Sequence, residues 1–172
     1  MSTTIKPVKF EYIKLPALRF IGIDAWRTKE DWGDMWLRKD EILEPLSSMN
    51  EHLYRELPYI CSFMHHDDGE VDVINRMLIG RFFVMDTPVP DGYDHHDLLP
   101  QTVAYAVFEN MIADVLWQRY EVTRDTILAD GITIPYPVGY WHAEMYYDKT
   151  PLIKENDPPF NCGVLFATNK DK

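Results

Sequence analysis

The feature that most constrains the fold of this chain is a set of short segments that recur at nearly constant spacing. The offsets between paired segments are 84, 83 and 81 residues, in a chain of 172. A period that holds across whole units indicates a duplicated structural unit. We therefore expect two similar halves that share one architecture. The paired segments are Leu15-Pro16 with Leu99-Pro100, Gly80-Arg81-Phe82-Phe83 with Gly163-Val164-Leu165-Phe166, and 59–67 with 140–148.

Each half shows the same order of patterns, namely strand, helix, strand and strand. Alternating polarity predicts strands, and apolar residues spaced three and four apart predict helices. Asp31 is placed to cap a helix whose apolar positions extend to Leu53, and Pro45 should either break this helix into two pieces or kink it. The expected strands are 8–14, 18–28, 59–66 and 77–86 in the first half, then 101–109, 140–148 and 160–168, with a second helix over 112–127.

Turn-forming residues separate these segments. The stretch 87–100 is rich in Pro, Asp and His, so we expect a surface loop that divides the halves. We also expect a turn at 67–70 and a loop at 154–159. The organisation predicted is a single domain over 1–172, with repeat one at about 8–86, a linker at 87–100 and repeat two at about 101–168.

These patterns predict an α+β fold built from two pseudo-twofold-related strand-helix-strand-strand repeats with antiparallel sheets. Each sheet should carry one helix on one face. If the sheets lie side by side, their helix-free faces form a central ligand cleft, because pockets favour such junctions.

The strand at 140–148 carries the candidate site. Successive side chains of a strand point to opposite faces, so one face holds a carboxylate among an imidazole and two phenols. The other face is apolar and is expected to lie under a helix. The first face carries Tyr140, His142, Glu144 and Tyr146, and the second carries Trp141, Ala143, Met145 and Tyr147.

Glu144 is the central candidate, because a buried charge needs a partner. It would reach water, join a salt bridge, or bind a cation in the cleft. Phe63 and Trp26 are candidate walls of an aromatic box, where each ring contributes roughly 0.5–2 kcal/mol to cation binding. Either ring would serve equally well in the core.

Other reactive residues give weaker signals. His142 is better explained as a hydrogen-bonding residue than as a base. The repeat register pairs Cys61 with His142, which raises a Cys–His nucleophile only if the two lie within hydrogen-bond reach. The clusters 65–68 (HHDD) and 94–97 (DHHD) lack the ligand spacing of a dedicated metal site. We expect no metal and no cofactor.

Composition excludes several classes of partner. The net charge of −11 argues against nucleic-acid binding, which needs a concentrated basic surface. No apolar run approaches the roughly 18 residues of a membrane span, and the first residues do not form a signal peptide. Two cysteines, Cys61 and Cys162, are typical of reduced thiols. We expect a soluble, cytoplasmic protein.

Four segments resemble the gyrase-inhibitor-like (GyrI-like) small-molecule-binding domain, which also forms the effector-binding part of some AraC-type and MerR-type regulators. They are LPALRFIGIDAW, IGRFFVMDTPVPDGY, LPQTVAYAVF and GYWHAEMYYD. The resemblance runs from about Val8 to Ala167 and is most specific at Glu144-Met145-Tyr146. It implies a pseudo-twofold fold with a central cleft in which Glu144 faces a bulky, flat or cationic ligand. No helix-turn-helix flanks the domain, so we expect a stand-alone form that does not bind DNA.

Three functions follow as hypotheses. The first is a sensor or sequestering protein that binds amphipathic, cationic or aromatic small molecules through Glu144, Tyr146, His142, Tyr140, Phe63 and Trp26. The resemblance also suggests a hydrolase of electrophilic cyclopropane-type toxins, with Glu144 as acid or base and Tyr146, or else Tyr140, holding water. The third is a protein-interaction module whose groove accepts a regulator or another protein partner.

Overall fold

One antiparallel sheet of eight strands forms the centre of the computed structural model, which describes residues 5–66, 76–112, 115–136, 138–147 and 159–171. The strand order is β1-β6-β8-β7-β3-β4-β2-β5. The strands are β1 (Lys9–Leu15), β2 (Leu18–Asp24), β3 (Ile60–His65), β4 (Arg76–Val84), β5 (Asp94–Leu98), β6 (Gln101–Met111), β7 (Trp141–Tyr146) and β8 (Phe160–Ala167). The expected turn at 67–70 and most of the expected loop at 154–159 lie outside the described residues.

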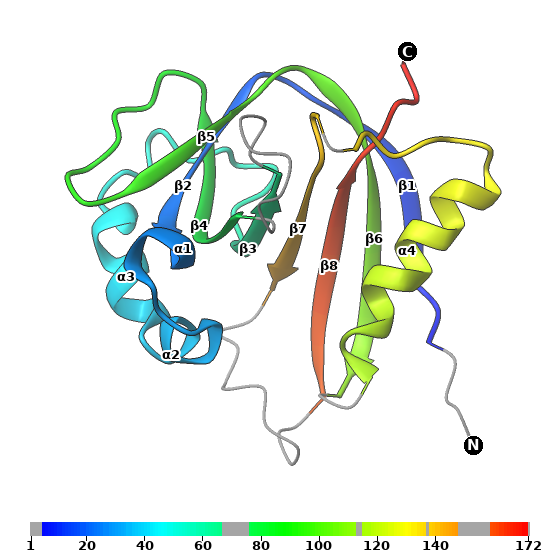
Figure 1. Cartoon of the computed structure of the whole chain (residues 1–172), viewed down its shortest axis with the longest axis horizontal. Helices are drawn as coiled ribbons and strands as arrows, with labels where there is room; N and C mark the ends of the chain where they lie inside the picture. Colours follow the sequence, from blue (N-terminus) through cyan, green and yellow to red (C-terminus); the bar gives the residue numbers. More distant parts are fainter. Residues whose placement is uncertain (1–4, 67–75, 113–114, 137, 148–158, 172) are drawn as a thin grey trace.

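The order of the strands is symmetrical about the centre of the sheet. The units β2–β3–β4 and β6–β7–β8 mirror each other, and they join where β3 pairs with β7. The outer strands are exchanged, because β1 precedes β2 but pairs with β6, while β5 precedes β6 but pairs with β2. Figure 1 shows these two connections crossing between the halves. The α+β fold is thus confirmed, with one continuous sheet instead of two adjacent ones.

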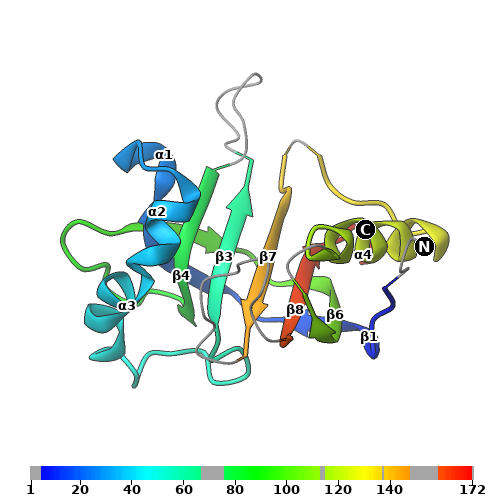
Figure 2. The same ribbon diagram turned by 90° about the horizontal axis from the view of Figure 1, so that it is seen from below.

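Within the described residues, four helices connect the strands. They are α1 (Ala25–Thr28), α2 (Trp32–Leu37), α3 (Lys39–Ser47) and α4 (Gln118–Ala129). Asp31 caps α2 by accepting a hydrogen bond from the Gly33 amide, as expected. Figure 2 shows α1–α3 and α4 on opposite sides of the central strands β3 and β7. Within the described part of the chain, no helix is long and apolar enough to cross a membrane.

Several boundaries differ from the sequence-based expectations. The strand expected at 18–28 ends at Asp24, because this side chain accepts a hydrogen bond from the Trp26 amide and starts α1. The break in the first helix falls at Arg38, not at Pro45, which lies within the last turn of α3. The stretch 87–100 is not only a loop, since it contains the edge strand β5. The second helix begins at Gln118 instead of residue 112.

The largest correction concerns the face of the sheet that the helices cover. Trp36 of α2 packs on the ring of Tyr146, with centroids 4.6 Å apart, and Arg119 of α4 hydrogen-bonds to the Tyr146 hydroxyl. Both helical groups therefore lie on the face that carries Glu144, which was expected to be free of helices. Helices on both sides leave space between them over the central strands.

The opposite face is covered by the sheet itself. Its buried residues include Phe20 of β2, Phe63 of β3 and Trp141 of β7, which form one apolar cluster. The rings of Phe20 and Phe63 stack at 4.6 Å, and those of Phe63 and Trp141 lie 5.5 Å apart. The contact between Phe20 and Phe63 joins strands that are separated by β4, which requires a strongly curved sheet. No helix is needed to bury this face.

Candidate functional site

Glu144 lies in the middle of β7, and its side chain is 18% exposed. Its Oε2 atom is 2.5 Å from Nη2 of Arg119 and accepts a hydrogen bond of 3.1 Å from the Tyr146 hydroxyl. Arg119 Nη2 also donates to the Tyr146 oxygen, at 3.1 Å. The three side chains thus form a closed triangle of charge-assisted contacts. Of the alternatives for Glu144, the structure shows the salt bridge.

Arg119 was not identified from the sequence. It lies in the first turn of α4 and is only 2% exposed. Its helical position falls within the apolar stripe, since Leu116 precedes it by three residues and Thr123 follows by four. A charged residue at a core-facing position signals a buried partner, because an unpaired buried charge is costly. That signal was present, but the partner could be found only in three dimensions.

A chain of hydrogen bonds runs from α4 to His142. The hydroxyls of Tyr120 and Tyr140 are 3.0 Å apart, and the Tyr140 hydroxyl is 2.9 Å from Nδ1 of His142. The imidazole also stacks on Phe166, with ring centroids 5.3 Å apart. His142 therefore is the hydrogen-bonding residue that was expected, and Tyr140, His142, Glu144 and Tyr146 do share one face.

Burial determines the protonation of this face. It lowers the pKa of His142 to about 4, with the Glu144 charge acting in the opposite direction, so the ring is neutral near pH 7. Burial also raises the pKa of Tyr146 and of Tyr140, so both phenols stay protonated. Within the structure described, Nε2 of His142 is buried and has no hydrogen-bond partner.

A cavity of about 370 Å³ opens above these residues. Glu144 and His142 contribute to its base, and Glu121 of α4 is an exposed part of its lining. The remaining lining residues are Met64, Trp117 and Tyr120. Trp117 is 60% exposed, so a large ring borders the opening.

A second hollow continues this surface toward α1. Its volume is about 550 Å³, and its lining includes Trp26 and Met77. Met77 is the cross-strand neighbour of Met64, and Met64 is the neighbour of His142. The two cavities therefore lie side by side on one face, with methionines between them. Trp26 is 52% exposed and stands at the far end of this groove.

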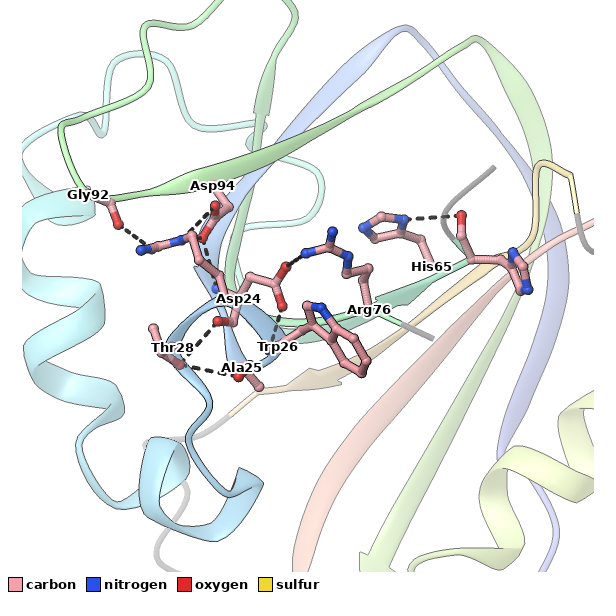
Figure 3. A network of polar contacts seen from close by, with 10 residues as sticks. Asp24, Ala25, Trp26, Thr28, His65, Arg76, Gly92 and Asp94 are labelled. Atoms are coloured by element: carbon pink, nitrogen blue, oxygen red, sulfur yellow. Dashed lines mark hydrogen bonds and ion pairs between the residues drawn. The ribbon is translucent and has the colours of Figure 1, made fainter. Parts of the chain in front are cut away.

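The position of Trp26 depends on a polar network around Asp24, shown in Figure 3. The Asp24 carboxylate accepts from the Trp26 amide at 2.8 Å and pairs with Arg76 at 2.7 Å. The Asp24 amide in turn donates to Asp94 of β5, at 3.1 Å. The network joins α1 to three strands, and it places Trp26 on a helix instead of the expected strand.

Phe63 does not belong to this site. It is the neighbour of Ala143 on the opposite face and is fully buried between Phe20 and Trp141. The pairing of Cys61 with His142 is also wrong. Cys61 is paired with Met145 and points to the opposite face, because a shift of one residue in register reverses the side of a strand. A Cys–His nucleophile is therefore not formed.

The two histidine clusters meet in space. His65 and His96 stack with centroids 4.0 Å apart, while Asp94 pairs with Arg27 and Asp97 with Arg19. Among the residues with described positions, no group of three His, Cys, Asp or Glu side chains is arranged to hold a metal ion. Asp67 and Asp68 lie outside the described residues.

Comparisons with known proteins support the fold. No protein-family model matches the sequence, and the comparison with curated proteins also gives no match. Among solved structures, SAV2435 bound to tetraphenylphosphonium matches with a TM-score of 0.62 and 15% identity, covering 95% of each chain. A protein named for bacterial transcription regulation, from Staphylococcus aureus MU50, matches with a TM-score of 0.57 and 16% identity, covering 93% of this chain and 97% of its own.

The C-terminal domain of EcmrR matches with a TM-score of 0.51 and 13% identity, covering 94% of this chain and 98% of the domain. These structures fit the GyrI-like effector-binding fold that the sequence resembles. At such identities the likeness concerns the fold alone, so the function must be argued from the site.

Proposed function

We propose that this protein binds amphipathic organic cations in the groove between α1 and α4, as a sensor or sequestering domain. The observation that carries the proposal is the lining of the Glu144 cavity, which combines two carboxylates with an exposed tryptophan, a half-buried tyrosine and a methionine. Carboxylates attract a cation, and aromatic and thioether groups supply apolar contact area.

The ion pair with Arg119 does not remove the preference for a cation. Arg119 bonds to Oε2 of Glu144, and no hydrogen bond to Oε1 is formed by the residues whose positions are described. Glu121 also lines the cavity, and among the described side chains none forms an ion pair with it. Two carboxylates face a single buried guanidinium, so the Glu144 cavity keeps a net negative charge. In the second hollow, Lys29 and Glu30 carry opposite charges.

The apolar parts of the groove match the rest of such a ligand. Met64 and Met77 have flexible side chains that adjust to ligands of different shape. Trp26 and Trp117 are exposed at the two ends of the groove, where their faces can stack on rings or cations. The likeness to SAV2435 bound to tetraphenylphosphonium supports a ligand of this class.

Calorimetric titration with tetraphenylphosphonium tests the proposal, with neutral triphenylphosphine oxide as the matched uncharged ligand. Wild-type protein should bind the cation at least about tenfold more tightly, which corresponds to about 1.4 kcal/mol. Glu121→Gln should weaken cation binding by a few-fold, while Glu44→Gln, on the exposed surface of α3, should not. Absence of cation binding in the wild type would refute the proposal.

Glu144 requires a different variant, because Glu144→Gln alone leaves Arg119 buried without a counter-ion. The double variant Arg119→Met/Glu144→Gln removes both charges and preserves much of the packing. If Glu144 contributes to cation affinity through its free oxygen, the double variant should bind tetraphenylphosphonium more weakly and triphenylphosphine oxide equally well. Equal loss of both ligands would instead indicate damage to the shape of the groove.

The hydrolase alternative is less well supported by this geometry. It assigned Tyr146 to hold a water molecule, but the Tyr146 hydroxyl is buried between Glu144 and Arg119. Tyr140 is engaged with Tyr120 and His142. We therefore propose binding without turnover. A pull-down from lysate with and without tetraphenylphosphonium distinguishes the two binding roles, because a sensor should change its protein partner when the cation is added.

A further inference from the structure

A third cavity lies on the other side of Tyr120 from Glu144. Its volume is about 500 Å³, and it is bounded by α4, the segment 132–136, Tyr140 just before β7, and the strand β8. Tyr120 lines both this cavity and the Glu144 cavity, so the two share a wall. The lining residues are Tyr120, Arg124, Leu128, Thr133, Ile134, Tyr136, Tyr140 and Phe166.

Aromatic residues form half of this lining, since four of its eight residues carry aromatic rings. The rings of Tyr136 and Tyr140 lie 5.6 Å apart, and those of Tyr120 and Phe166 lie 5.1 Å apart. Tyr136 is 70% exposed and Leu128 is 51% exposed, so these apolar surfaces are accessible from solvent. A concave apolar site of this size with a few polar groups is typical of small-molecule binding.

The charge of this cavity is opposite to that of the Glu144 cavity. Arg124 is the one charged residue in the lining described, which contains no carboxylate. Arg124 lies near enough to the rings for its charge to oppose the rise in the pKa of Tyr140, a rise caused first by burial. Its own ion pair with Asp125 is largely exposed, so the guanidinium can turn to a ligand at little cost.

We propose that this cavity is a second binding site, which takes an aromatic ring bearing an acidic group, such as an aryl carboxylate or sulfonate. The ring lies among Tyr136, Tyr140 and Phe166, and the acidic group pairs with Arg124. A planar guanidinium forms two parallel hydrogen bonds to such a group, which favours it over a point charge. A cation is disfavoured because Arg124 is the charged residue of the described lining, and its partner Asp125 does not line the cavity.

Fluorescence titration with 1-anilinonaphthalene-8-sulfonate tests this site, with neutral N-phenyl-1-naphthylamine as the uncharged analogue. Arg124→Gln should weaken binding of the sulfonate at least about tenfold and leave binding of the amine unchanged. Tyr136→Ala should weaken both probes, because it removes ring contact. Arg124 and Tyr136 are both accessible to solvent, so these variants should keep the fold. Arg55→Gln, at another exposed arginine, should bind both probes like the wild type.

The position of the probe is tested separately by amide chemical-shift mapping with the wild-type protein. The sulfonate should perturb the amides of 124–136, whereas tetraphenylphosphonium should perturb those around Met64 and Glu144. Unchanged sulfonate affinity in Arg124→Gln would overturn the inference. So would sulfonate-induced shifts confined to the Glu144 cavity, or equal affinity of the neutral amine. None of these outcomes bears on whether the cation binds at Glu144.

Discussion

Arg119 and Glu144 form an ion pair across the interface between α4 and β7, with Nη2 and Oε2 2.5 Å apart. The guanidinium is almost completely buried, while the carboxylate keeps partial access to the groove. One oxygen of the carboxylate is therefore used to hold the helix on the sheet. Glu144, the candidate ligand-binding residue identified from the sequence, therefore also helps to hold α4 in place beside the cavity.

The first prediction concerns this pair. Glu144→Gln should lower the free energy of unfolding by about 3–5 kcal/mol, because it leaves a buried guanidinium without its counter-ion. Arg119→Met should cost less, since the partly exposed carboxylate can be hydrated. The double variant Arg119→Met/Glu144→Gln should regain much of the stability that Glu144→Gln loses. Urea denaturation of the four proteins measures this cycle, and strictly additive losses would show that the two residues do not interact.

The second prediction is a pH dependence that arises from His142. Its pKa is lowered by burial to about 4 in the folded protein, below its usual value of 6.5. Between these values the unfolded chain binds a proton that the folded protein does not. The contribution of neutral His142 to the free energy of unfolding should therefore be fully present above about pH 6.5. It should be lost as the pH decreases toward 4, by about 3 kcal/mol in total.

Urea denaturation at about pH 7.5 and about pH 5 tests the role of His142, because carboxylates also titrate in acid. His142→Phe keeps an aromatic ring against Phe166 but cannot be protonated, so the difference in stability between the two pH values should shrink. His95→Gln, at an exposed position of β5, should keep the wild-type difference. An unchanged difference in His142→Phe would contradict this assignment.

The third prediction concerns the contact between β2 and β4. Gly22 and Gly80 are cross-strand neighbours, and a Cβ atom at Gly80 would overlap the carbonyl oxygen of Ile21. Gly80→Ala should thus destabilise the protein by about 3 kcal/mol, since backbone must move. Gly33→Ala, within α2, should be neutral or slightly stabilising, because its Cβ would meet only the Asp31 side chain. Thermal unfolding compares the two variants.

The fourth prediction is that both thiols are unreactive in the folded protein. Cys61 and Cys162 are fully buried, and burial raises the pKa of Cys162 to about 11 and that of Cys61 further. Little thiolate is then present near pH 7. Ellman's reagent should modify neither thiol before unfolding and both in concentrated guanidinium chloride. Rapid modification of the native protein would show that one of the thiols is exposed or that the fold opens locally.

Patterns that depend on near neighbours were predicted well. The alternation along β7 correctly placed Tyr140, His142, Glu144 and Tyr146 on one face, because side chains of any strand alternate. The cap at Asp31 was also correct, since it needs only the next few residues. The α+β class and the duplicated order of elements followed from the same local periodicities. The boundaries of the domain and repeats stay predictions.

Elements that depend on distant partners were missed or misplaced. The edge strand β5 has the sequence of a polar loop, and it becomes a strand because β2 offers it a hydrogen-bonding edge. The repeat match at an offset of 81 aligned Cys61 with His142, yet these two residues lie on opposite faces of the sheet. Phe63, for which the site and the core were left equally open, lies in the core. A local pattern cannot reveal a shift of one residue between two distant strands.

The sequence by itself determined that a carboxylate flanked by an imidazole and two phenols would lie on one face of a strand. Only the tertiary structure decided what meets that face. Curvature of the sheet buries Trp141 and Phe63 against other strands, so the helices are left to cover the side that carries Glu144. Arg119 reaches Glu144 for the same reason. Which face of the sheet the helices cover is decided by long-range packing between surfaces, and not by the polarity of neighbouring residues.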